Sequence, residues 1–328
     1  MSTVAVVLCN YNHAKYLPDS LRHICQQDRP ADQIVVIDDG STDDSWAIIQ
    51  QFAQDNPSIE AYSNGQNLGL EASIAKALTK VRCDYLVWTA ADDRLLHHFL
   101  ARNMEVLSRY PQAALSFSEV VVLKGDSEET NHYAANPASA HIFNHSELPD
   151  YVSPDDLRQR MQQGYLPIAS NTCVVRVSLL KELGGFPAAL RWFADSFTYI
   201  LLAMRHGACV VSEPLAFIRS HDDHYSQAMH DKTKQSVVLD AIFDMLNRAD
   251  FRDIRAFMKR CPSNLTPYEP FLKLVLLKRP KDWDILATYV AWEVLTHKNR
   301  TGATWPILIK HAVLLTLRKL GLRRNGAA

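Results

Sequence analysis

Val36-Ile37-Asp38-Asp39-Gly40-Ser41-Thr42-Asp43 is the stretch of this chain that says most about its fold. The apolar residues 34–37 have the length and composition of a buried strand, and they end abruptly at two aspartates, a glycine and a serine. Buried strands of an α/β sheet bring their carboxyl ends to one edge of the sheet, where ligands bind. The stretch therefore predicts a strand that delivers two carboxylates to a ligand site.

A second strand is expected to end in the same way. The apolar residues 85–89 are followed, after two alanines, by Asp92-Asp93, and carboxylate oxygens suit Mg²⁺ or Mn²⁺. Two such pairs at one edge repel each other unless a cation or a hydrogen-bond donor joins them. Together they indicate a metal-bound ligand that carries phosphate. For each pair alone, a helix N-terminus is the competing interpretation.

Short apolar strands alternate with helix-length amphipathic segments. Strands are expected at residues 4–9, 33–37, 59–62, 84–89 and 114–123, with helices after residue 17, after a cap at Ser41 or Thr42, over 70–81 and over 95–110. This alternation predicts the α/β class, with a Rossmann-like, mostly parallel sheet flanked by helices. Residues 124–164 are polar and are expected to form an irregular substrate loop or lid. Strands at 172–177, 208–212 and 215–218, a helix at 195–206 and a mostly helical C-terminal extension are expected to follow.

Composition narrows the function classes. The 328 residues allow one large domain or two, and 47% hydrophobic with 22% charged residues is ordinary for a globular protein. A formal net charge of −1 argues against a nucleic-acid partner. The six cysteines lack C-x-x-C spacing, which favours reduced thiols in a cytoplasmic compartment. No signal peptide is recognised, and no segment has the roughly 18 uninterrupted apolar residues of a spanning helix.

Two further side chains are candidates for chemistry. Asp195 lies among aromatic residues, and a partly desolvated carboxylate has a raised pKa that suits it to accept a proton. A helix N-cap is the alternative, and spacing alone favours it. His221 follows the last apolar strand and could bind a metal or a phosphate, although an isolated surface histidine is the commoner case.

In this order the motifs resemble those of the family 2 glycosyltransferases, which have the glycosyltransferase A fold. The similarity covers about residues 4–226 and rests on Asn10-Tyr11-Asn12, the run 38–43, Asn67-Leu68-Gly69, Asp92-Asp93, Gly184-Gly185-Phe186, Asp195 and His221. The resemblance implies an inverting, metal-dependent transfer of a sugar from a nucleotide-sugar donor, most simply a UDP sugar. The acceptor would be a hydroxyl of a glycan or a lipid-linked molecule, in the synthesis of cell-surface polysaccharide.

The resemblance also implies residue roles. The donor-binding set is Tyr11, Asn12, Asp38, Asp39, Asn67, Gly69 and Asp92. Asp93 and His221 would hold the divalent metal, Mn²⁺ or Mg²⁺, and Asp195 would be the catalytic base. Side chains at residues 92–94 and 170–171 are expected to influence which sugar is used.

Three positions depart from the family pattern. Ala90 stands at the first acidic position of the usual Asp-x-Asp motif, so metal binding depends on the remaining carboxylates. Ala194 replaces the glutamate that usually precedes the base. Arg191-Trp192 occurs without the glutamine of the Gln-x-x-Arg-Trp motif of processive synthases, which favours addition of a single sugar.

Residues 1–226 are therefore predicted to form a nucleotide-sugar-binding catalytic domain, and residues 227–328 a helical region. Within the latter, residues 284–324 combine apolar and basic faces. Such a segment can lie on an anionic membrane surface, and packing against the catalytic domain is an equally good interpretation.

Three other classes of protein share some of these features. A nucleotidyltransferase is expected to begin with a glycine-rich phosphate loop, where this chain has Asn10-Tyr11-Asn12. A phosphoacceptor signalling domain would be much shorter and would need a lysine at a strand end. A non-catalytic glycan- or nucleotide-binding protein that retains the fold is the remaining alternative, because a fold does not determine a function.

Overall fold

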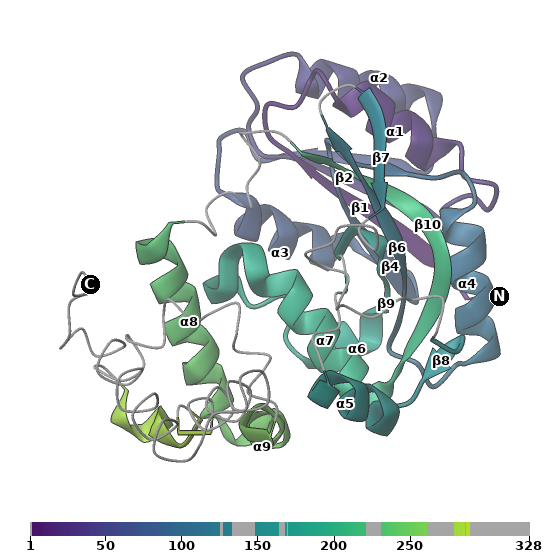
Figure 1. Cartoon of the computed structure of the whole chain (residues 1–328). Helices are drawn as coiled ribbons and strands as arrows, with labels where there is room; N and C mark the ends of the chain where they lie inside the picture. The colour runs from purple at the N-terminus through teal and green to yellow at the C-terminus, as the bar shows by residue number, and fades with distance from the viewer. Residues whose placement is uncertain are drawn as a thin grey trace, which may run out of the picture. The chain divides into compact units, whose positions relative to one another are not determined.

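The computed structural model describes residues 2–124, 127–132, 148–163, 168, 170–220, 231–260, 279–285, 287 and 288. The chain divides into two compact units (Figure 1). Unit 1 comprises Met1–Leu157 and Leu166–His224, and unit 2 comprises Arg158–Tyr165 and Tyr225–Ala328.

A ten-stranded sheet forms the centre of unit 1 in the described residues, with the main order β3-β2-β1-β4-β9-β6-β10-β5 and with β7 and β8 attached to β6 and β10. Strands β1 to β4 pair in parallel, as do β6 and β10. Strand β9 lies antiparallel between β4 and β6, so β6 keeps the direction of β4. The predicted α/β class with a mostly parallel sheet is confirmed. The strands are β1 (Val4–Asn10), β2 (Gln33–Asp38), β3 (Ile59–Ser63), β4 (Tyr85–Ala90), β5 (Arg94–Leu95), β6 (Leu115–Lys124), β7 (Ser127–His132), β8 (Tyr151–Val152), β9 (Val174–Arg176) and β10 (Ala208–Ser220).

Helices cover both faces of this sheet, which is why every residue of β1 and β2 is buried. The helices of unit 1 are α1 (Leu17–Cys25), α2 (Ser45–Asp55), α3 (Leu70–Lys80), α4 (Phe99–Arg109), α6 (Val177–Glu182) and α7 (Ala194–His206), with the short 3₁₀ turns η3 (Ser170–Thr172) and η4 (Ala188–Phe193). Helix α5 (Pro154–Gln163) begins in unit 1 and ends in unit 2.

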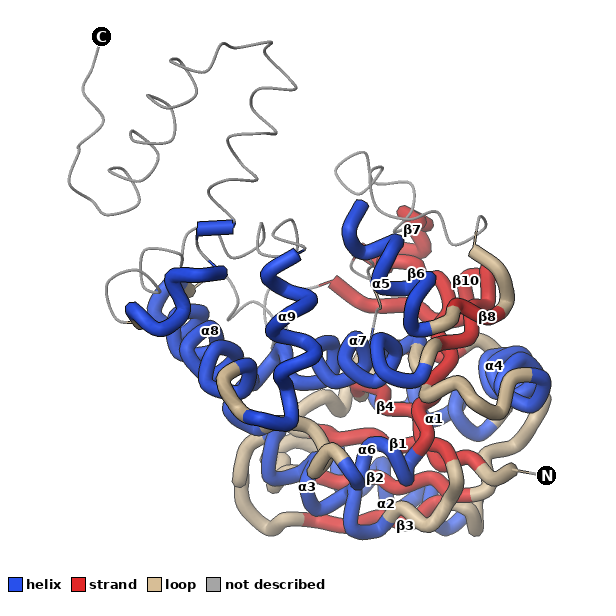
Figure 2. The backbone as a smooth tube through the Cα atoms, turned by 90° about the horizontal axis from the view of Figure 1, so that it is seen from below, coloured by secondary structure: helices blue, strands red, loops and turns tan. Residues whose placement is uncertain are grey.

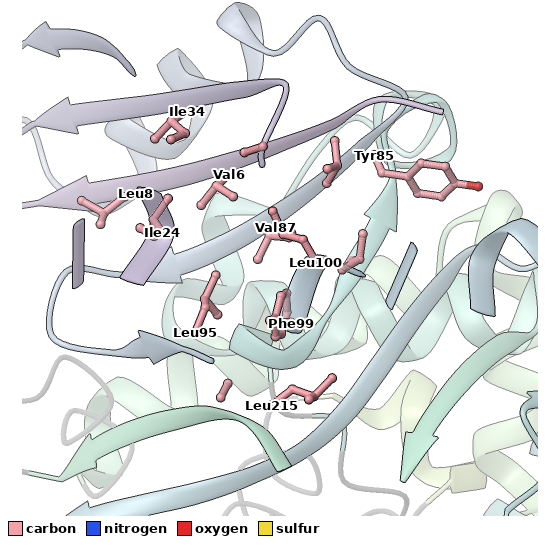
Figure 3. Packing of buried hydrophobic residues seen from close by; sticks show 14 of the residues in the cluster. Val6, Leu8, Ile24, Ile34, Tyr85, Val87, Leu95, Phe99, Leu100 and Leu215 are labelled. Atoms are coloured by element: carbon pink, nitrogen blue, oxygen red, sulfur yellow. The ribbon is translucent and has the colours of Figure 1, made fainter. Parts of the chain in front are cut away.

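One face of the sheet carries the main hydrophobic core. Alternate residues of β1, β2 and β4 pack there against α1, α2 and α4. Figure 3 shows Val6, Leu8 and Val87 of the strands beside Ile24 and Phe99 of the helices. A fully buried side chain of this size stabilises the fold by about 1.5–3 kcal/mol, so this cluster is a main source of the stability of unit 1.

The opposite face of β4 carries an aromatic cluster that matters for the candidate site. The ring of Phe186 lies 6.3 Å from Trp88 of β4 and 5.6 Å from Tyr199 of α7, measured between ring centroids. The turn before Phe186 approaches α3 closely, because a Cβ added to Gly185 would lie 3.2 Å from the side chain of Leu78. These contacts fix α7 and the Gly184-Gly185-Phe186 turn against the sheet.

Several local predictions were wrong. Leu95 is not helical: it lies in β5, which pairs antiparallel with β10, and α4 begins only at Phe99. Ser41 and Thr42 do not cap α2, whose N-cap is Asp44, because Ser41 bonds to Asp38 instead. The stretch predicted to be irregular contains β7, β8 and α5. The two strands expected at 208–212 and 215–218 form one strand, β10, whose register shifts around Pro214.

Unit 2 is helical in its described part, with α8 (Lys232–Leu246), α9 (Arg252–Arg260) and short 3₁₀ turns (Figure 2). The Asp231 side chain caps α8 by accepting from the backbone N–H groups of Thr233 and Lys234. Asp282 is fully buried and accepts hydrogen bonds from Arg279, Arg255 and Asn247. Removing one member of such a buried ionic group leaves an unpaired charge, which strongly destabilises a protein.

Among the described residues, none of the helices combines the length and apolar character needed to cross a membrane. The basic segment predicted at residues 284–324 lies outside the described residues, apart from 284, 285, 287 and 288. Its membrane contact therefore stays a prediction.

Candidate functional site

The ends of three neighbouring strands bring the acidic motifs to one edge of the sheet. Asn10, the last residue of β1, pairs with Asp38, the last residue of β2, and the Asn10 amide donates to the Asp38 carboxylate over 3.0 Å. On the other side of β1, Cys9 pairs with Ala90, the last residue of β4. The sequence predicts both aspartate pairs at one edge of the sheet, and the structure places them at the ends of β2 and β4, the two strands that pair with β1.

Asp38 joins the loop after β1 to the loop after β2. Its carboxylate accepts from the Asn10 amide and from both the backbone N–H and the hydroxyl of Ser41. The Ser41 hydroxyl oxygen in turn accepts from the Asn12 N–H at 3.0 Å, and the Asn12 side chain accepts from the Thr42 N–H at 2.8 Å. Asp38 and Asn12 thus shape these loops, and their contact with a donor stays a prediction. Tyr11, between Asn10 and Asn12 in the chain, is 40% exposed and accessible to a planar ligand.

Asp39 holds the loop that contains Asn67 and Gly69. Its carboxylate accepts from the Asn64 amide at 2.7 Å and from the backbone N–H groups of Leu68 at 3.0 Å and Gly69 at 2.9 Å. The loop passes so close to residue 40 that only glycine fits: an added Cβ would lie 2.3 Å from the backbone of Gln66. A carboxylate has about four acceptor positions, so three bonds leave Asp39 one for a ligand N–H.

Asp92 and Asp93 are both buried, with 5% of each residue exposed. Burial, and then the neighbouring Asp92 carboxylate, raise the pKa of Asp93 well above its usual range. Two protein donors act in the opposite direction. The Asn171 amide donates to one Asp93 oxygen at 3.2 Å, and the backbone N–H of Arg219 donates to the other at 3.1 Å.

Arg219 is a site residue that sequence reasoning missed. Its side chain is buried near the end of β10, where the guanidinium donates to the backbone carbonyl of Asp92 at 3.3 Å and stacks 4.8 Å from the ring centre of Tyr16. An arginine at the end of an apolar run carries no motif, so the sequence held no signal for this contact. The predicted metal ligand His221, two residues later, lies outside the described residues.

The residues around Asp93 fit a hard divalent cation. No group of three or more His, Cys, Asp or Glu side chains in the described residues is arranged to hold a metal. However, the side chain of Asn171 contacts Asp93, and its buried carbonyl oxygen has no hydrogen-bond partner within the described part of the chain. Acidic oxygens together with an unpaired neutral oxygen form the type of donor set that Mg²⁺ and Mn²⁺ accept.

Asp195 lies in the first turn of α7, where the N-cap residue is Phe193, so the predicted alternative of an Asp195 N-cap is wrong. The residue keeps partial exposure, whereas its carboxyl group lies inside the protein. This burial raises the pKa of Asp195, while hydrogen bonds from Ser196 and from the Ser170 hydroxyl act to lower it. A carboxylate with these properties can accept a proton near neutral pH.

The backbone before Asp195 is strained. The backbone of Arg191 has a φ of 47°, a value that residues other than glycine rarely adopt. Strain of this kind concentrates at functional sites, because the surrounding structure must impose it.

The turn η3 connects the two halves of the site. Ser170 donates to Asp195, and the next residue, Asn171, donates to Asp93. Asp39, Asp93 and Asp195 are therefore linked within unit 1 through neighbouring strand ends and one short turn. The arrangement offers a proton acceptor beside a buried acidic pair, as a group transfer from a phosphate-linked donor requires.

The chain is similar in sequence to several curated proteins. It is 24% identical to a putative teichuronic acid biosynthesis glycosyltransferase, TuaG, of Bacillus subtilis over 136 residues, which are 42% of this chain and 54% of that protein. It is 31% identical to a cholesterol galactosyltransferase of Borreliella burgdorferi over 118 residues, 36% of this chain and 31% of that protein. The chain thus spans about half or less of these relatives' length.

Solved structures share the fold. The S. aureus protein TarS, residues 1–349 in complex with UDP-GlcNAc, superposes with a TM-score of 0.54 at 13% identity, covering 92% of this chain and 93% of that one. The mannosyltransferase PcManGT of Pyrobaculum calidifontis, in complex with GDP-Man and Mn²⁺, gives 0.52 at 18% identity, covering 98% and 81%. The family profile described as glycosyl transferase family 2 matches residues 5–184, more than half of the chain. The protein is a glycosyltransferase of family 2.

Proposed function

We propose that the protein transfers a single sugar, with inversion, from a UDP-linked donor to a hydroxyl of a glycan or lipid-linked acceptor in cell-surface polysaccharide synthesis. The observation that carries the proposal is the turn η3, whose adjacent residues bind Asp195 and Asp93. TarS in complex with UDP and with UDP-GlcNAc supports a UDP sugar, and PcManGT with GDP-Man makes a GDP sugar the alternative donor.

In the proposed reaction Asp195 accepts the proton of the acceptor hydroxyl as its oxygen attacks the anomeric carbon. The bond from that carbon to the diphosphate breaks, and the nucleoside diphosphate leaves with the electron pair. Asp195 has the required property, because burial raises its pKa toward the range of a useful base. The donor would lie along the edge formed by Tyr11, Asn12, Asp38, Asp39, Asn67, Gly69 and Asp92.

Asp93, with the predicted ligand His221, would hold a Mn²⁺ or Mg²⁺ ion. A bound divalent cation supplies electrostatic stabilisation of the charge that develops on the departing diphosphate. The protein contributes the burial of the acidic pair and the donors from Asn171 and Arg219 that orient Asp93.

The proposal is tested by isothermal calorimetry with UDP and GDP in the presence of Mn²⁺, paired with an assay for release of nucleoside diphosphate from a panel of UDP and GDP sugars. We expect UDP to bind and one UDP sugar to be turned over. If GDP binds more tightly than UDP, the donor is a GDP sugar and not a UDP sugar. Nucleotide binding without release from any sugar, in the presence of candidate glycan acceptors, would favour the non-catalytic alternative, for which Ala90 is the specific observation.

We further propose that residues 1–226 are the catalytic domain and that residues 227–328 form a helical region whose basic segment rests on the inner face of a membrane. Liposome flotation of the protein with and without residues 307–328 tests this contact. Equal flotation of the two forms would show that these residues are not the anchor.

A further inference from the structure

We propose that Asn171 is a direct ligand of the divalent cation, and that its amide oxygen compensates for the carboxylate missing at Ala90. The inference rests on the proposed function and adds a residue to its metal site.

Asn171 is 4% exposed, and its carbonyl oxygen has no hydrogen-bond partner among the residues that the structure describes. The NH₂ group of this amide donates to the Asp93 carboxylate at 3.2 Å, which leaves the carbonyl oxygen as its free acceptor. A buried acceptor without a partner is unfavourable by about 1–3 kcal/mol, so such atoms are retained where a ligand satisfies them.

The charge around this oxygen selects the kind of ligand. Asp92 and Asp93 are both buried, and the Asp93 carboxylate accepts hydrogen bonds from two N–H groups, one of Asn171 and one of Arg219. The further group beside them is again an acceptor. Two buried carboxylates beside a neutral oxygen form a donor set that suits a divalent cation.

The sequence departure fits this assignment. Ala90, the last residue of β4, stands at the first acidic position of the motif that the chain resembles. The carboxylates that remain are those of Asp92 and Asp93, which follow the strand. Asn171 reaches the same acidic pair from η3, across 78 residues of sequence. A cation held by Asp93 would thereby gain an oxygen ligand from a second structural element.

The experiment measures binding of Mn²⁺ to the full chain by the electron paramagnetic resonance signal of free Mn²⁺, with and without UDP. Asn171→Ala is expected to weaken Mn²⁺ binding by about tenfold or more, the loss typical of a residue at a metal site. Asn171→Asp is expected to tighten it, because a carboxylate replaces a neutral ligand and charge count sets affinity. Asn103→Ala is the matched control: this buried asparagine of α4 is bonded to Phe99 and Ser116, and its loss should leave Mn²⁺ binding unchanged.

Each other outcome overturns the inference. If Asn171→Asp weakens Mn²⁺ binding as much as Asn171→Ala, the residue acts only by donating to Asp93. If both variants bind Mn²⁺ like wild type but lose affinity for a UDP sugar relative to UDP, Asn171 contacts the sugar instead. Wild-type protein that binds neither UDP nor Mn²⁺ would refute the proposed function itself, which separates that failure from failure of the ligand assignment.

Discussion

Replacing Asp39 with asparagine separates the structural work of this carboxylate from its proposed role in donor binding. In the wild type the carboxylate accepts from the Asn64 amide and from the backbone N–H groups of Leu68 and Gly69. Asparagine keeps one acceptor oxygen and places an NH₂ group where the other oxygen was. At least one of the three N–H donors then faces the NH₂ group of the new asparagine instead of an oxygen.

The size of the effect follows from these contacts. A hydrogen bond to a charged group contributes about 1.5–3 kcal/mol, and a donor left unpaired in a buried place adds a penalty of similar size. Water can reach part of the loop, since Leu68 is 51% exposed, and this recovers some of the loss. We therefore expect Asp39→Asn to be destabilised by about 2–4 kcal/mol, which lowers the thermal midpoint of a domain of this size by roughly 5–10 °C.

Thermal unfolding followed by circular dichroism measures the change, and calorimetry with UDP measures donor affinity in the same protein. Asp44→Ala is the matched control, because Asp44 is an exposed aspartate five residues later whose side chain makes no cap hydrogen bond to α2. We expect the control to stay within about 0.5 kcal/mol of wild type. If Asp39→Asn unfolds like the control, the carboxylate does not hold the 64–69 loop and the reasoning is wrong.

Three further predictions concern the other acidic residues. Asp195→Asn should bind UDP like wild type and lose turnover by about 10²–10⁴-fold, the usual contribution of a general base; retained turnover would exclude Asp195 from that role. Because the base must be ionised and burial raises the pKa of Asp195, kcat/KM should fall as pH drops through that raised pKa. Ser170→Ala removes a hydrogen bond that favours ionisation, so the acidic limb of the pH profile should move to higher pH; a limb that stays in place contradicts the contact. Folding raises the pKa of Asp93, so at pH values above the ordinary pKa of an aspartate this carboxyl group destabilises the folded state. In the absence of metal, Asp93→Asn should therefore have a higher thermal midpoint than the wild type at pH 7. That difference should shrink as the pH falls below the ordinary aspartate range, and Asp93→Asn should also lose the thermal response to Mn²⁺.

Strands and strand ends were predictable because their signal is local. A continuous apolar run such as residues 34–37 can be buried on both faces only as an interior strand, and the polar residues that follow must lie at the sheet edge. The α/β class followed from the alternation of apolar strands with helix-length segments, and the placement of both aspartate pairs at one edge of the sheet followed from this argument. It needed no knowledge of which strands pair.

The contacts that organise the site depend on which strands and loops lie side by side in the fold. The local sequence does not show these neighbours, because they are far apart along the chain. Ser41 has the composition of a helix cap, yet it bonds to Asp38 and Asn12, because the loop after β1 lies beside it in the folded chain. Leu95 has the periodicity of α4, yet β10 offers it a strand partner from 121 residues further along. Arg219 is the clearest case. It lies near the end of β10, and it contacts the Asp92 carbonyl only because the residues that follow β4 lie beside that end in the folded chain.

The turn η3 connects the proposed base, Asp195, with the acidic pair at Asp92 and Asp93. Ser170 and Asn171 are consecutive, so the separation between the groups they hold, Asp195 and Asp93, is set by one short piece of backbone. Thr172 and Cys173 are fully buried and anchor this piece next to β9. A displacement of η3 would therefore move the proton acceptor and the acidic pair together. In the proposed reaction, that linkage would keep a fixed separation between the base and the metal site, and an attack on the anomeric carbon depends on such positioning.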